Sequence, residues 1–168
     1  MKLKDFYLAQ LEREAVSTRK AVERVPEGQN SFKPHERSME LGYLAALVAG
    51  MLAWIELMIE RDELDLDKAE SEGFRTHALA SKAELLASLD DAVAKARRAL
   101  EGTTDEHLLT PWAFKMGGHA VSQNPRWIMI ADAVFSHLAH HRGQLTVYLR
   151  LADSKVPALY GPSADERF

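Results

Sequence analysis

Two histidines in the last predicted helix carry the strongest chemical signal of this sequence. His137 and His141 are four residues apart, so on a helix their Cβ atoms lie about 5–6 Å from each other. At ~100° of rotation per residue, both fall in the middle of an apolar face and His140 falls at its edge. That face is formed by Ile130, Val134, Leu145 and Tyr148. The spacing lets both imidazoles reach one metal ion, as in the HxxxH pairs of zinc enzymes.

The pair alone leaves two interpretations open. A buried histidine is often a core residue whose ring bonds to a backbone carbonyl or a carboxylate. A metal site needs further ligands, because useful zinc sites have at least three from the protein. The chain contains no cysteine, which removes thiolate ligands, disulfides and cysteine nucleophiles. Ser136 beside His137 is not a catalytic pair, since adjacent helical positions point apart.

Four helical patterns must position this pair, and no convincing strand is visible. They cover about residues 2–23, 38–59, 81–102 and 124–152. Ser38 can cap the second helix, and Ser81 with Glu84 forms a capping-box pattern for the third. Asn124 and Pro125 suit the first positions of the last helix. The tail after residue 155 contains prolines and should lie extended on the helices.

The second helix is unusually apolar. Residues 41–55 run uncharged, but a membrane span needs roughly 20 such residues. The segment is therefore interpreted as a buried helix of a soluble bundle. Its small residues predict close contact with another helix, either at the centre of the fold or at a subunit contact. They are Gly42, Ala46, Ala49, Gly50 and Ala53.

Two long connectors separate the helices. Residues 61–78 are charged and predict a solvated connector that can hold a short helix. Residues 103–124 predict an irregular segment, and such segments often form lids or binding loops. The alternative is a connection that crosses the end of the bundle and plugs it with Trp112 and Phe114. Gly117 and Gly118 are no phosphate loop, because no strand is predicted before them.

Composition narrows the class of protein. The 168 residues fit one domain, 1–168, and 46% are hydrophobic, enough for a core. The formal charge of −4 argues against nucleic acid as a partner. The first residues lack the apolar stretch of a signal peptide. We expect a cytoplasmic protein without a membrane partner.

The motif from His137 to Leu145, followed by Tyr148-Leu149-Arg150, resembles the last-helix signature of the DinB-like superfamily. The segments around Lys33–Gly42 and Val156–Asp165 also resemble members of that family, so the likeness covers the chain end to end. It implies an all-α, antiparallel four-helix bundle that is commonly a homodimer. It also implies a divalent metal, zinc or nickel, held by three histidines, two of which match His137 and His141. Characterised relatives mostly use the metal to activate a low-molecular-weight thiol or a water.

The sequence departs from the family pattern at the third ligand. That histidine lies in the second helix, about six residues after the Leu-Gly pair, and the corresponding residue here is Leu47. No histidine lies between His35 and His77, so the second helix supplies no imidazole in any register. The remaining candidates are weaker: His119 and His107 in the long connector, and His35 and Glu40 before the second helix. Solvent exposure is the simpler interpretation of His35, His77 and His107.

Two functions remain open. The first is a DinB-like protein of unassigned reaction, with a degenerate metal site at His137 and His141 that serves a thiol- or water-activating transferase or hydrolase. The second is a metal-free, non-enzymatic bundle that binds a small apolar ligand or a protein partner in the cleft beside Leu47.

Overall fold

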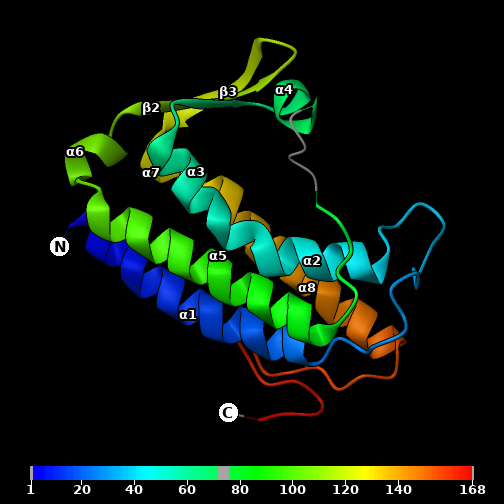
Figure 1. The fold of residues 1–168 in the computed structure, drawn as a ribbon. Helices are drawn as coiled ribbons and strands as arrows, with labels where there is room; N and C mark the ends of the chain where they lie inside the picture. The colour runs from blue at the N-terminus through cyan, green and yellow to red at the C-terminus, as the bar shows by residue number, and fades with distance from the viewer. Residues whose placement is uncertain (1, 72–75, 168) are drawn as a thin grey trace.

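Helices form most of the structure. The computed structural model describes residues 2–71 and 76–167. Within those residues, four long helical stretches lie lengthwise against one another (Figure 1). They are α1 (Leu3–Glu23); α2 (Leu41–Gly50), continued by η1 (Met51–Ala53) and α3 (Trp54–Glu60); α5 (Lys82–Gly102); and α7 (Arg126–Met129), continued by η2 (Ile130–Ser136) and α8 (His137–Leu151). The predicted helices are all present. Two shorter helices, α4 (Leu66–Ser71) and α6 (Asp105–Leu108), occupy the predicted connectors.

The helix ends follow the predicted capping only in part. Ser81 Oγ accepts a hydrogen bond from Glu84 N at 3.2 Å, and the Glu84 carboxylate accepts one from Ala80 N at 2.8 Å. The start of α5 is therefore confirmed. Elsewhere the predicted caps are wrong. Glu40 instead of Ser38 precedes α2, and Pro125 precedes α7 because Asn124 belongs to a strand.

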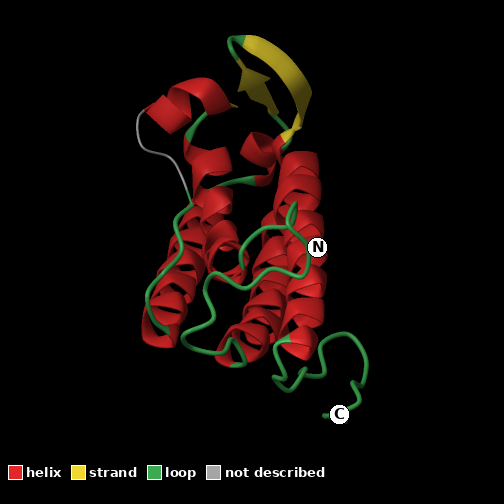
Figure 2. Ribbon diagram, turned by 90° about the vertical axis from the view of Figure 1, so that its right-hand side faces the viewer, coloured by secondary structure: helices red, strands yellow, loops and turns green. Residues whose placement is uncertain are grey.

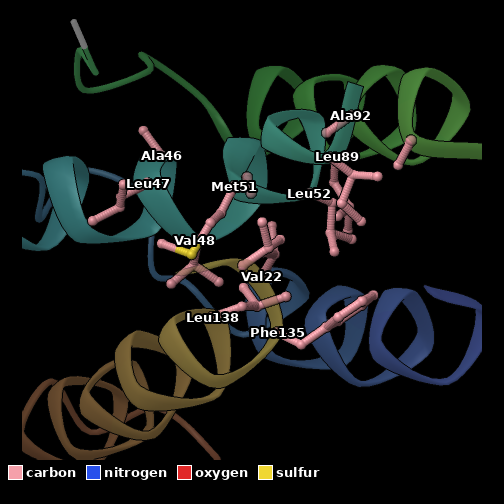
Figure 3. Packing of buried hydrophobic residues seen from close by; sticks show 14 of the residues in the cluster. Val22, Ala46, Leu47, Val48, Met51, Leu52, Leu89, Ala92, Phe135 and Leu138 are labelled. Carbon is pink, nitrogen blue, oxygen red and sulfur yellow. The ribbon is translucent and has the colours of Figure 1, made fainter. Parts of the chain in front are cut away.

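One apolar core joins the long helices. In Figure 3, Val48 and Leu52 of the central stretch lie among side chains of the three other long helices. Those labelled there include Val22 of α1, Leu89 of α5 and Leu138 of α8. All five of these side chains are almost completely buried.

The small-residue stripe of α2 packs inside the chain. A Cβ atom added to Gly42 would lie 2.9 Å from the Cβ of Asn30 and 3.1 Å from that of Ala78. Gly50 faces Ser88 of α5, and Ala46 and Ala49 are buried. Of the two predicted positions, the centre of the fold is the one observed. The stripe therefore does not argue for a subunit contact.

The second helical stretch is long and apolar enough to be compared with a membrane span. The continuous helical run Leu41–Glu60 has 20 residues and by length and composition alone could cross a membrane. However, 61% of its most apolar window is buried inside the protein, as in a core helix.

A small sheet corrects the all-α prediction. β1 (Glu63–Asp65), β2 (Pro111–Met116) and β3 (His119–Pro125) form a three-stranded sheet in that order. β1 pairs with β2 in parallel, and β2 pairs with β3 antiparallel. The turn between β2 and β3 consists of Gly117 and Gly118, with φ of 56° and 80°, values that glycine adopts without steric cost. The segment that we predicted to be irregular is thus largely a hairpin, and the sheet lies at one end of the helices (Figure 2).

A buried arginine attaches this sheet to the helices. Arg126, 1% exposed, donates from Nε to Met58 O at 2.9 Å and from its terminal nitrogens to Pro111 O at 2.9 Å and Arg61 O at 3.1 Å. It also donates to Thr110 Oγ1 and to the carboxylate of Asp62. One guanidinium therefore joins the end of α3, the start of β2 and the start of α7.

A second buried arginine fixes the C-terminal tail, which is extended as predicted. Arg142 is fully buried and pairs with the Glu14 carboxylate at 2.5 Å. It also donates to Thr18 Oγ1 at 2.8 Å. The Tyr160 hydroxyl, from the tail, donates to the same Glu14 carboxylate at 2.8 Å. The pair thus holds α1, α8 and the tail together.

We expect Arg142→Met to lower the free energy of unfolding by about 3–5 kcal/mol, because it leaves the Glu14 charge buried without its guanidinium. The double variant with Glu14→Leu should recover much of this loss, since no unpaired charge remains. Urea unfolding measures both. Arg150→Met, which breaks the exposed Arg150–Asp165 pair, is the matched control and should cost far less. A double variant as unstable as Arg142→Met alone would contradict the expectation.

Candidate functional site

A cavity of about 920 Å³ lies between the long helices and the sheet. Its walls come from α2, α3, η2 and α8 on the helical side and from the sheet and α4 on the other. The aromatic part of the lining is Tyr43, Trp54, Trp112 and Phe114. The polar part includes Ser122, Asn124, Asp132 and His137. Trp112 of β2 is buried and lines the cavity. Strand β2 therefore forms part of the cavity wall.

A π-helix determines which residues of the last helical stretch face the cavity. Ile130–Ser136 has this geometry directly before His137. In a π-helix each N–H bonds to the carbonyl five residues back, so each turn holds an extra residue. Asp132 and His137 are five apart and both line the cavity, whereas an α-helix would place them about 140° apart. Sequence reasoning at ~100° per residue therefore missed Asp132.

The structure brings the predicted histidine pair into direct contact. The Nε2 atoms of His137 and His141 are 2.8 Å apart, and His141 Nδ1 is 2.8 Å from Gln144 Oε1. Because the amide oxygen of Gln144 only accepts, His141 Nδ1 carries a proton and donates it. His141 Nε2 is then the acceptor for the N–H at His137 Nε2. The ring of Trp54 lies against His137, with centroids 5.8 Å apart.

Burial sets the charge of His141. His141 is buried, while His137 is half-buried at the cavity wall. Burial lowers the pKa of His141 below its ordinary value of 6.5, and the neighbouring His137 and His140 lower it further against the opposing hydrogen bond to Gln144. His141 is therefore neutral at pH 7, which is the form that accepts a hydrogen bond or binds a metal.

The described residues do not complete a metal site around the pair. Leu47 lines the same cavity as His137, so the residue that the family resemblance matches to the third histidine is an apolar part of the wall. Among the described residues, no three histidine, cysteine or acidic side chains are grouped to hold an ion. The 2.8 Å separation of the two Nε2 atoms is also shorter than the ~3.3 Å that two nitrogens bound to one tetrahedral zinc require. The residues present therefore do not fit a resident zinc or nickel ion.

The other predicted ligand candidates are engaged or placed elsewhere. His107 Nε2 lies 2.8 Å from Ile59 O, which binds α6 to α3. His119 is exposed and pairs with Met116 beside the hairpin turn. His35 Nδ1 accepts a hydrogen bond from Arg37 N. His77 is exposed, as predicted, and it also lines the cavity.

Comparisons with known proteins agree on one family. The model of the DinB family matches residues 1–167. A DinB-like protein from Bacillus subtilis is similar with a TM-score of 0.66 at 18% identity, over 95% of this chain and 98% of that one. A DinB-like protein from Bacillus cereus is similar with a TM-score of 0.69 at 21% identity, over 92% and 95% of the two chains. At such identities these structures support the fold alone. No curated protein matches the chain.

We expect the free energy of unfolding to fall as the pH drops below about 6.5, the ordinary histidine pKa. The unfolded chain then takes up a proton at His141, whereas the folded chain does so only below its lowered pKa. Protonation therefore favours unfolding across that interval. Urea unfolding at pH 7 and pH 5 should show a smaller decrease for His141→Gln than for the wild type. His140→Gln, which alters an exposed neighbour, should retain the decrease. Equal decreases in wild type and His141→Gln would contradict the assignment.

Proposed function

This chain belongs to the DinB family, and from that premise we propose that it binds a small, largely apolar molecule in the cavity beside His137. The proposal includes the antiparallel four-helix bundle and the single domain that the sequence predicts, with the four long helical stretches as the bundle helices. The cavity occupies the end that the sheet covers.

The observation that carries this proposal is the cavity itself. Its volume of about 920 Å³ falls within the ~300–1,000 Å³ typical of small-molecule sites. Its walls are mainly aromatic and aliphatic, with a few polar groups that can orient a ligand. Such a lining favours an apolar body carrying a small number of polar atoms.

Leu47, at the position that matches the third family histidine, also favours an apolar ligand. A leucine at residue 47 adds apolar surface to the cavity that His137 lines, and apolar surface favours an apolar ligand. The hydrogen bond between the imidazoles satisfies both Nε2 atoms without an ion. We therefore place binding ahead of metal-dependent catalysis for this chain.

We expect the neutral dye Nile red to bind saturably, with one site per chain and enhanced fluorescence. Ala133→Trp should weaken that binding, because Ala133 lines the cavity and the indole would occupy part of the space open to the dye. Ala139→Trp, at a similarly half-buried position outside the lining, should bind as the wild type does. Circular dichroism confirms that both variants are folded. Unchanged dye binding by folded Ala133→Trp would overturn the proposal.

A second candidate is the degenerate metal site, which the four-residue spacing of His137 and His141 predicts. In this interpretation His137 and His141 supply two ligands and the third is missing at Leu47. The reaction would be that of a thiol- or water-activating transferase or hydrolase. A homodimer and a cytoplasmic location also stay predictions, and the buried stripe on α2 lends the dimer no support.

Leu47→His decides whether that position completes the site. We expect it to raise zinc or nickel affinity at least tenfold, about 1.4 kcal/mol, because a third imidazole adds a bond and displaces a water. Without metal the variant should be less stable, since an imidazole replaces a buried leucine. Calorimetric titration of both proteins measures the affinities. Equal affinities would mean that residue 47 is not the ligand position. Tight wild-type binding that disappears in His119→Ala would instead restore the metal-dependent interpretation.

A further inference from the structure

Resting on the proposed binding function, we infer that this cavity selects a small organic cation, an amine or quaternary ammonium group carried on an apolar body. Three features of the lining support this class of ligand: its acidic side chains, the availability of the Asp132 carboxylate for pairing, and its aromatic side chains.

Among the described lining residues, the acidic side chains have no basic counterpart. Asp132 and Glu70 are carboxylates, and the described lining residues include no lysine or arginine. The whole chain has a formal charge of −4. A cation entering the cavity is therefore attracted by the Asp132 carboxylate, which repels an anion.

Asp132 is available to pair with such a cation. Within residues 2–71 and 76–167, no hydrogen bond or ion pair engages its carboxylate. Its negative charge acts on its surroundings. Together with burial, which is the larger cause, it raises the pKa of the Tyr7 hydroxyl to about 12. The π-helix brings this carboxylate to the same cavity as His137.

The aromatic lining adds a second attraction for a cation. Two tryptophans, a phenylalanine and a tyrosine line one cavity, and the faces of such rings attract ammonium groups within about 6 Å. These rings also bury apolar surface of any ligand, so they alone do not select for charge. The carboxylate supplies the selection, and the rings supply most of the affinity.

The test compares three soluble probes that share one phenylpropyl body and differ in charge. They are trimethyl(3-phenylpropyl)ammonium, 3-phenylpropan-1-ol and 3-phenylpropanoate. Each competes with Nile red on the full chain at pH 8, where histidines are ordinarily neutral, and at constant ionic strength. Calorimetry provides the Kd of each probe directly.

We expect the ammonium probe to bind at least tenfold more tightly than the alcohol, and the carboxylate most weakly. Asp132→Asn keeps the shape and removes the charge, so it should bring the ammonium Kd close to that of the alcohol and leave the alcohol unchanged. Asp91→Asn, at a carboxylate paired with Lys95 on α5 and outside the lining, should change neither.

Three results would overturn the inference. If the alcohol or carboxylate binds as tightly as the ammonium probe, the cavity binds small molecules without selecting cations, and the proposed function survives alone. If the cation preference persists in folded Asp132→Asn, the selection does not come from this site. If neither the dye nor any probe binds the folded wild type, the proposed function and the inference both fail.

Discussion

The cavity depends on the hydrogen bonds that a single buried guanidinium makes. Arg126 donates to carbonyl oxygens at the end of α3 and the start of β2, and also to the carboxylate of Asp62 beside β1. A lysine could not replace it, because one ammonium has three donors and no planar fork. These bonds hold the sheet over the helix ends, and the sheet in turn supplies Trp112 and Phe114 to the wall. The end of the helical body is thereby a lined cavity instead of an open surface.

The histidine pair shows how one sequence spacing serves two chemistries. Imidazoles four residues apart on a helix can share an ion, or they can share a proton. Here His141 is oriented by Gln144 and buried, which keeps it neutral, and the ring of His137 meets it edge to edge at hydrogen-bond distance. Leu47 on the cavity wall supplies no further ligand, so the two imidazoles share a proton and not an ion. The pair then acts as a polar point in a mainly apolar wall, able to orient a ligand.

Periodicity in the sequence was sufficient for the helices, because their apolar faces repeat every three or four residues and Ser81 and Glu84 mark a start. The Gly117-Gly118 turn is a local hairpin signal that could have revealed β2 and β3. No local signal could reveal β1, since Glu63 pairs with Ala113, fifty positions along the chain. Leu47 and His137 both line the cavity, and the sequence drew attention to both, whereas it did not indicate Asp132. A prediction that assumes the same rotation for every residue cannot include a π-turn, because a π-turn depends on tertiary packing.

Because of that π-turn, the position of Asp132 on the cavity wall and the spacing of His137 and His141 can change independently. A π-segment is equivalent to one extra residue inserted into an α-helix. If substitutions between residues 130 and 136 restored regular α-helical winding at unchanged chain length, Asp132 and His137 would lie about 140° apart around the helix. Asp132 would then leave the cavity wall, while the spacing of His137 and His141 would stay intact. Descendants of this chain could therefore change what the cavity admits and still carry the same histidine signature. A shared signature in this helix is accordingly a poor guide to shared ligands.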